Sequence, residues 1–148
     1  LPAGYRDYIL VYAYKASPEV VRKAQLMAKE KKLKLIAVGY RQKWCDKVLM
    51  DVEPLQWLSL MRDARYVITS TFHGTIFSIK YKKDFFYITN KKAYNRVQSL
   101  FDLCQIEANI NVGEGELISI SPDYKSVDKN ITPASKFSLN WLIKAVDG

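Results

Sequence analysis

The 148-residue chain has little cysteine and no long apolar run. Cys45 and Cys104 are its only cysteines, and two widely separated cysteines form neither a disulfide framework nor a zinc site, so we expect free thiols. No apolar stretch reaches the roughly 18 residues that a transmembrane helix needs, and no signal-peptide pattern opens the chain. The chain begins with Leu1 rather than Met, which suggests a piece of a longer protein, although removal of a leader would also explain it.

Acidic residues are too few to balance the basic ones. Asp and Glu number 15 against 23 Lys and Arg, a net charge of +8. This excess favours an anionic partner such as nucleic acid, a phosphorylated metabolite or a membrane surface. The densest cluster, residues 29–34, lies where a helix is expected to end, and lysines there complement the helix dipole. We therefore interpret the cluster as a solvated helix end rather than a nucleic-acid patch.

Apolar runs and helical patterns alternate along the chain. The alternation predicts an α/β sandwich with a parallel sheet, and the length suits one domain. Residues 40–52 look like a polar connection, and residues 107–130 are hardest to interpret, with a turn near Gly113 and a candidate short strand at 117–120. The expected strands span residues 7–14, 33–39, 66–69 and 84–89, and the expected helices span 17–32, 53–63, 93–105 and a last segment capped by Thr132-Pro133.

One stretch changes character in its middle and organises the rest. Residues 66–69 are β-formers in an unbroken run, typical of a strand buried on both faces, whereas the apolar residues after Thr75 suit a short helix on that sheet. Between them, Ser70 or Thr71 can cap the helix, and Gly74 lets a ligand or a second backbone approach closely. The segment 70–75 is therefore predicted to be a strand-to-helix turn at the carboxyl edge of the sheet.

His73, the only histidine of the chain, lies in this turn. A helix start concentrates positive potential and unpaired N–H donors, which suits phosphate or carboxylate. Ligands of open α/β sheets bind beyond the carboxyl ends of the strands, where this turn should lie. A capping or packing role for His73 remains the alternative.

Two further basic residues are candidates at the same edge. Lys92 follows the strand 84–89 and either meets a phosphate or carries solvated charge. Arg96 lies in the first turn of the next helix, where a cation is unfavourable for the helix dipole. We therefore expect a ligand, an acidic partner or a tertiary salt bridge to hold Arg96.

The residues around this turn resemble a known family. Residues 54–58 (Pro-Leu-Gln-Trp-Leu) and then 63–79, with Thr-Phe-His-Gly-Thr at 71–75, look like the C-terminal half of the polysaccharide pyruvyl transferase family. Residues 96–101 are similar to the helix that usually follows. The resemblance covers residues 53–104 well and the flanks loosely, and its Phe-His-Gly run is fairly specific in this context.

The resemblance implies a fold and an activity. The chain would be a single Rossmann-like domain, residues 1–148, forming the C-terminal half of a GT-B-like enzyme whose N-terminal half is a missing partner. The activity would be transfer of a pyruvyl group from phosphoenolpyruvate to a sugar hydroxyl of an exopolysaccharide or its precursor. The acceptor would be a sugar or a lipid-linked saccharide. We expect no cofactor besides the donor substrate, no metal, no nucleic acid and a cytoplasmic location, with peripheral membrane association left open.

The resemblance also implies roles for residues. His73 would contact the donor as a proton donor or phosphate anchor, since its pKa near neutrality suits proton transfer. Some members carry an Arg in an Arg-x-His arrangement where this chain has Thr71, so the donor-binding cation should come from Arg96, Lys92 or the other half. The expected substrate-binding residues are Ser70, Thr71, Phe72, Gly74, Thr75, Lys92 and Arg96.

Two other functions remain open. A GT-B glycosyltransferase would use the turn to grip the diphosphate of a nucleotide sugar. A non-catalytic sugar-binding module would use exposed aromatic side chains, and a Trp and Tyr patch away from His73 would favour it. An anion bound at His73 would favour either enzyme. Because a GT-B-like cleft needs two walls, we expect the 148-residue chain to fold but not to catalyse alone.

Overall fold

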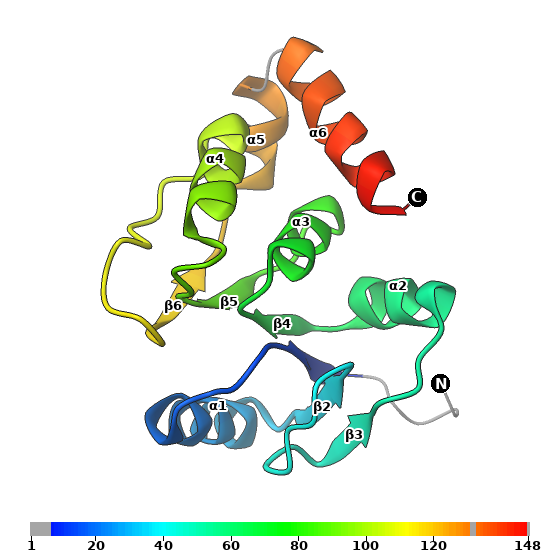
Figure 1. Ribbon diagram of the computed structural model, residues 1–148, viewed down its shortest axis with the longest axis vertical. Coiled ribbons are helices and arrows are strands. Elements are labelled where there is room, and N and C mark those ends of the chain that lie inside the picture. Colours follow the sequence, from blue (N-terminus) through cyan, green and yellow to red (C-terminus); the bar gives the residue numbers. More distant parts are fainter. Residues whose placement is uncertain (1–6, 131–132, 148) are drawn as a thin grey trace.

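A computed structural model describes residues 7–130 and 133–147, and Figure 1 shows its helices and strands in chain order. The strands are β1 (Tyr8–Tyr12), β2 (Lys34–Val38), β3 (Lys47–Leu49), β4 (Tyr66–Thr69), β5 (Phe85–Ile88) and β6 (Leu117–Ile120). The helices are α1 (Pro18–Lys31), α2 (Pro54–Asp63), α3 (Phe72–Lys80), α4 (Tyr94–Cys104), α5 (Tyr124–Asn130) and α6 (Pro133–Asp147).

The six strands form one sheet in the order β3-β2-β1-β4-β5-β6. All neighbouring pairs are parallel except β5 and β6, which are antiparallel. This is the strand order of doubly wound, Rossmann-type sheets, so the predicted α/β fold is confirmed. The sheet is parallel except for β6 at one edge, and an antiparallel edge strand is common on such sheets. The order reverses between β1 and β4, which makes their carboxyl ends the topological switch point.

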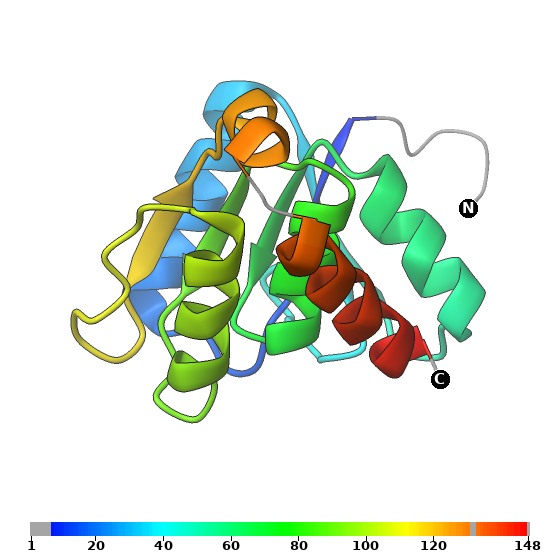
Figure 2. The same cartoon turned by 90° about the horizontal axis from the view of Figure 1, so that it is seen from above.

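Helices cover both faces of the sheet, as Figures 1 and 2 show. Helix α1 packs on one face through Val20, Ala24 and Ala28, against inward residues of β1 and β2 such as Val11 and Ala37. Helices α2 to α6 gather over the other face, where the larger of the two cores lies. Its fully buried aromatic side chains are Tyr8, Phe77, Phe85, Tyr87 and Phe101.

Local signals account for the start and end of α1. The hydroxyl of Ser17 accepts a hydrogen bond from the backbone N–H of Val20, and Pro18 occupies the first turn, as expected of an N-cap followed by proline. Lys32 ends the helix in the left-handed conformation, with φ 55°. The lysine cluster therefore lies at the helix terminus, the position predicted for it.

Three elements differ from the sequence-based expectation. Residues 40–52 contain β3, whose half-buried residues pair with the edge of β2. Residues 107–130 contain α5 in addition to the expected strand at 117–120. Helix α3 begins at Phe72 rather than at Thr75. The cap expected at Thr132 lies outside the described residues.

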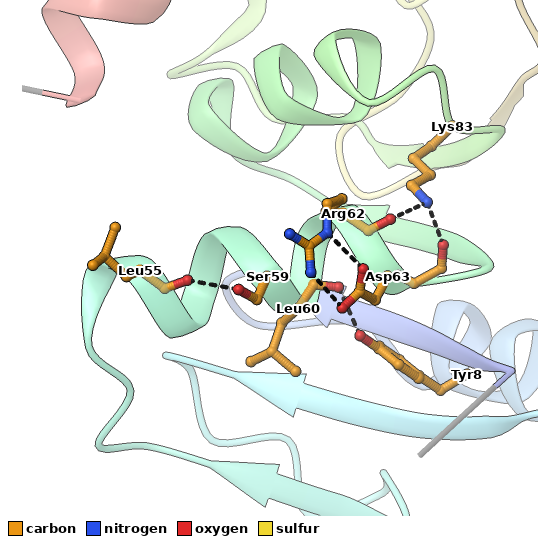
Figure 3. Close-up of polar contacts among 8 residues, drawn as sticks. Tyr8, Leu55, Ser59, Leu60, Arg62, Asp63 and Lys83 are labelled. Carbon is orange, nitrogen blue, oxygen red and sulfur yellow. Dashed lines mark hydrogen bonds and ion pairs between the residues drawn. The ribbon is translucent and has the colours of Figure 1, made fainter. Parts of the chain in front are cut away.

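At the amino edge of the sheet, polar side chains hold the end of α2, as Figure 3 shows. The hydroxyl of Tyr8 donates to the carbonyl of Leu60 at 2.8 Å. The ammonium group of Lys83 donates to the carbonyl of Arg62 in the last turn of α2 and, at 2.7 Å, to that of Ala64, the C-cap residue. Burial lowers the pKa of Lys83, which fits a side chain enclosed against the protein. The hydroxyl of Tyr8 and the ammonium group of Lys83 thus stabilise the end of α2.

Replacing Lys83 with Met should destabilise the fold by about 1–3 kcal/mol, because two helix-terminal carbonyls lose a charged donor. Replacing the neighbouring Lys82 with Met removes only an exposed ion pair to Asp128 and should cost no more than about 1 kcal/mol. Urea denaturation of both variants measures the difference. Equal losses would show that Lys83 contributes no more than a surface charge.

Candidate functional site

A chain of hydroxyl groups builds the turn between β4 and α3. The hydroxyl of Thr69 donates to the carbonyl of Tyr12 at 2.7 Å and accepts from the backbone N–H of Thr71 at 3.1 Å. The two threonine hydroxyls lie 3.1 Å apart, and the Thr71 hydroxyl accepts from the N–H of Gly74 at 2.9 Å. Because Thr69 uses its only hydroxyl proton on Tyr12, Thr71 donates in the bond between the two. The expected strand-to-helix turn is therefore present, and Thr71 caps it.

Ser70, the other candidate cap, has a different role. Its hydroxyl accepts from the backbone N–H of Tyr14 at 2.9 Å, so it ties the turn to the loop after β1. Its carbonyl accepts from the side-chain amide of Asn90 at 3.3 Å, which ties the turn to the loop after β5. The buried Ser70 therefore joins three loops that meet at the switch point.

Gly74 is required by the packing of α3 on its own strand. A Cβ at this position would lie 2.1 Å from the Thr69 hydroxyl and 2.8 Å from the Thr69 Cβ. Thr75 is fully buried, and its hydroxyl donates to the carbonyl of Thr71 at 2.9 Å. The close approach at Gly74 is with the side chain of Thr69, not with the second backbone that was expected as one alternative. Neither Gly74 nor Thr75 lines the pocket described next. Their predicted contact with substrate stays a prediction.

A pocket of about 500 Å³ opens at the carboxyl edge, beside this turn. Five of the predicted residues line it: Ser70, Thr71, Phe72, Lys92 and Arg96. They come from the start of α3, the loop after β5 and the first turn of α4, so segments far apart in sequence converge on one cavity. The first N–H groups of α3, at Phe72 and His73, have no partner within the helix and carry the positive end of its dipole.

The charges of the pocket are mainly positive. Lys15, Lys92 and Arg96 line it together with one carboxylate, that of Glu114. All four side chains are exposed, so each can meet a ligand without first leaving an enclosed position. A small molecule with two anionic groups would find both side-chain cations and backbone donors here.

Arg96 packs on an aromatic ring. Its guanidinium carbon lies 5.1 Å from the centre of the Phe72 ring, a cation–π contact. Within the described residues it forms no ion pair, so the salt bridge considered as an alternative is not found there. The stacking on Phe72 holds the cation at a helix start, despite the unfavourable dipole, and leaves its N–H groups for a ligand.

His73 lies beside the pocket and does not line it. The side chain of His73 is exposed, and the centre of its ring lies 6.1 Å from the centre of the Phe72 ring. Phe72 lines the pocket, so His73 is the next residue along the chain after a lining residue. Partial burial, and then repulsion from Arg96, lower the pKa of His73 below its usual value. The imidazole of His73 is therefore mainly neutral at pH 7.

Sequence reasoning missed the other residues that line the pocket, among them Tyr14, Lys15, Asn90 and Glu114. The first three follow directly after β1 or β5, so their position beyond a parallel strand was a usable signal. Glu114 gave no such signal, because it comes from the long segment before β6.

The loop that carries Glu114 is anchored by Thr89. The Thr89 hydroxyl donates to the carbonyl of Gly113 and accepts from the N–H of Glu116 at 2.8 Å. The Thr89 carbonyl accepts from the N–H of Gly115 at 2.9 Å, and Gly115 reaches it with φ 75°, a conformation that favours glycine. The carboxylate at position 114 is thus held at the rim by a buried threonine.

The described residues offer neither a reactive thiol nor a cluster of metal ligands. Cys45 and Cys104 are free, and burial raises their pKa values to about 12 and about 11, so both are neutral thiols at pH 7. In residues 7–130 and 133–147, no group of three or more His, Cys, Asp and Glu side chains lies close enough to hold a metal ion. No described helix is both long and apolar enough to cross a bilayer.

The strand order and the cationic pocket at the switch point define a doubly wound α/β domain suited to an anionic ligand. The family model described as polysaccharide pyruvyl transferase matches residues 2–92, and the chain belongs to this family of transferases. The match extends further toward the N-terminus than the residues quoted above, and it ends before Arg96. No curated protein matches the chain.

Replacing Gly74 with Ala should lower the free energy of unfolding by about 1–3 kcal/mol, because the added methyl group overlaps Thr69. Gly113→Ala is the control: its Cβ would meet only Glu116 at 3.5 Å, and the change should stay within about 0.5 kcal/mol. Chemical denaturation compares the two. If both variants unfold alike, α3 does not depend on this close approach.

The single histidine makes its titration directly observable by NMR. The His73 midpoint should lie below the usual value of about 6.5, because burial and Arg96 both disfavour the imidazolium. In the unfolded chain the pKa of His73 returns to its usual value. The free energy of unfolding therefore falls as the pH drops from that value to the lower pKa of the folded state. Arg96→Gln should raise the midpoint, and Lys91→Gln, a neighbouring charge change outside the pocket, should not. A midpoint at or above the usual value would contradict the assignment.

Proposed function

We propose that the chain is the donor-binding half of a polysaccharide pyruvyl transferase that moves a pyruvyl group from phosphoenolpyruvate to sugar hydroxyls. The observation that carries the proposal is the convergence of Lys92 and Arg96 on the pocket beside the α3 start. Phosphoenolpyruvate has a phosphate and a carboxylate, so it needs at least two positive centres. A three-carbon enol phosphate fills only part of 500 Å³, which leaves room for the acceptor hydroxyl.

Arg96 and Lys92 are proposed as the donor-binding cations. Thr71 occupies the position at which some family members carry an arginine, and Arg96 lies over the neighbouring Phe72 ring. A guanidinium in this place can form a forked pair with carboxylate or phosphate. Lys92 supplies a point charge on the same cavity, and the N–H groups of Phe72 and His73 add donors.

The reaction forms a ketal and releases phosphate. A proton adds to the methylene carbon of phosphoenolpyruvate, and one sugar hydroxyl oxygen bonds to the central carbon. A second hydroxyl oxygen of the same sugar bonds to that carbon as the carbon–phosphate oxygen bond breaks. The two hydroxyls release two protons, one for the leaving phosphate and one that balances the proton gained by the methylene carbon.

His73 is proposed to supply or relay a proton. Its imidazole is mainly neutral at pH 7, since partial burial and Arg96 lower its pKa. A bound phosphate would offset the charge of Arg96 and raise the pKa toward the working pH, which would charge the imidazole when the donor is present. Protonation would thereby be coupled to donor binding.

We further propose that an N-terminal Rossmann-like half forms the other wall of a GT-B-like cleft and helps to bind a sugar or a lipid-linked saccharide. The carboxyl edge of a single sheet leaves the pocket open on one side. A cytoplasmic reaction at the inner face of a membrane would bring the donor and a lipid-linked acceptor together.

One observation favours a second candidate, a glycosyltransferase that uses a nucleotide sugar. Glu114 places a carboxylate on the rim of the pocket, and an acidic side chain can accept hydrogen bonds from ribose hydroxyls. In that case Lys92 and Arg96 would hold a diphosphate. Assays of the complete protein with both donors separate the two functions, and turnover of the nucleotide sugar alone would replace our proposal.

In the complete protein, His73→Ala should lower kcat by about 10²–10⁴, as expected for loss of a proton-transfer group. Because the side chain is exposed, the loss of stability should not exceed about 1 kcal/mol. Arg96→Ala should mainly raise the KM for phosphoenolpyruvate. Lys91→Ala, next to Lys92 but outside the pocket, is the control and should change neither parameter.

Phosphate release measured together with thermal melting tests these variants. A His73→Ala protein with normal kcat at saturating donor would remove His73 from the mechanism. A large drop in melting temperature would instead identify it as a structural residue. The 148-residue chain alone is expected to bind the donor without turning it over, and turnover by it would refute the two-walled cleft.

A further inference from the structure

A second groove, of about 450 Å³, lies at the carboxyl ends of β1 and β2. The loop after β1 contributes Tyr14 and Lys15, and the loop after β2 contributes residues 40–44. Tyr14 and Lys15 also line the pocket beside the start of α3, which is called the donor pocket below. The groove and the donor pocket therefore adjoin at these two side chains. A ligand longer than one sugar could therefore occupy both.

A buried side chain builds this groove. Gln42 is 5% exposed, and its amide nitrogen donates to the carbonyl of Ala13 at 2.8 Å and to that of Tyr14. Its amide oxygen accepts from the indole N–H of Trp44 at 2.9 Å. One glutamine thus fastens the two loops together and fixes the orientation of the indole, so the groove is formed without a ligand.

Aromatic rings line the groove. Tyr14, which is 49% exposed, meets Tyr40 edge to face, with ring centres 4.9 Å apart at 66°. Tyr40 in turn packs against Tyr12, with ring centres 5.3 Å apart. Rings held in this way offer flat faces with negative quadrupole potential, on which the polarised C–H groups of a pyranose can pack. Tyr12 packs against Tyr40, and Tyr40 packs against Tyr14, so the rings lose little side-chain entropy when a ligand binds.

The charge of the groove is of one sign. Lys15, Arg41 and Lys43 line it, and no Asp or Glu is among its lining residues. In the part of the chain that the structure describes, none of the three forms an ion pair. A groove with sugar-binding faces and unneutralised cations fits a saccharide that carries negative charge, from a phosphate ester or from an acidic sugar.

We propose that this groove is an acceptor subsite, which holds the anionic part of a saccharide while its reacting hydroxyls reach the donor pocket past Tyr14 and Lys15. The inference rests on the proposed function, because it takes the adjoining pocket as the place of reaction. The aromatic surface adjoins that pocket, an arrangement that supports a subsite of an enzyme over an independent sugar-binding module.

Binding to the purified 148-residue chain tests the subsite, with the shifts of the tryptophan indole N–H signals in NMR as readout. The probes are glucose 1-phosphate, a tetragalacturonate, methyl glucoside, inorganic phosphate and a short oligothymidylate. We expect the Trp44 signal to shift with the two anionic saccharides at affinities at least tenfold above those for the neutral sugar and for phosphate. A preference between the phosphorylated and the acidic sugar identifies the source of the charge.

The double variant Arg41→Ala with Lys43→Ala should weaken saccharide binding at least tenfold. Both side chains are exposed, so the fold should be retained. Lys125→Ala with Lys129→Ala removes the same charge from exposed positions on α5 and is the matched control. Equal weakening by the two double variants, equal binding of phosphate and saccharide, or tighter binding of the oligothymidylate would each overturn the proposal.

Kinetics of the complete protein separate this inference from the proposed function. Arg41→Ala with Lys43→Ala should raise the KM for an anionic acceptor at least tenfold and leave the KM for phosphoenolpyruvate unchanged. An unchanged acceptor KM refutes the subsite even when pyruvyl transfer is observed. A wild-type enzyme without pyruvyl transfer refutes the proposed function, and the binding data on the 148-residue chain then still decide whether the groove holds anionic saccharides.

Discussion

The contact between α3 and β4 is the constraint on which the functional edge of the molecule depends. Gly74 has no room for a Cβ beside Thr69, and the Thr69 hydroxyl simultaneously holds β1 and the cap of α3. This approach sets the direction in which α3 leaves the sheet. It thereby aims the free N–H groups of the helix at the switch point, where Phe72 then supports Arg96.

Buried polar side chains connect the loops after β1, β2, β4 and β5 and the loop before β6 at this edge. Ser70 joins the turn to the loops after β1 and β5, Gln42 joins the loops after β1 and β2, and Thr89 anchors the loop before β6. Each forms hydrogen bonds that would be costly to leave unmade in a buried place. The cavities at this edge are therefore preformed. At the opposite edge, Tyr8 and Lys83 use comparable bonds to complete α2.

Part of the net charge of +8 is concentrated at the carboxyl edge of the sheet. Lys15, Lys92 and Arg96 surround one cavity, and Arg41 and Lys43 extend the field along the adjoining groove. The family match ends before Arg96, so this cation belongs to a part of the chain outside the matched residues. Its position over Phe72 shows how a tertiary contact can supply a charge beside the turn that Thr71 caps.

The sequence by itself determined the α/β class, most of the strands and helices, and the strand-to-helix turn that begins at Ser70, because these follow from local periodicity and capping. Only the tertiary structure decided the pairing of β3, the antiparallel direction of β6 and the presence of α5, which depend on partners distant in sequence. It also decided that Lys92 and Arg96 meet at one cavity, that Glu114 joins them, and that His73 lies beside the cavity. Local patterns cannot show such placements, because they arise where loops from separate strands converge.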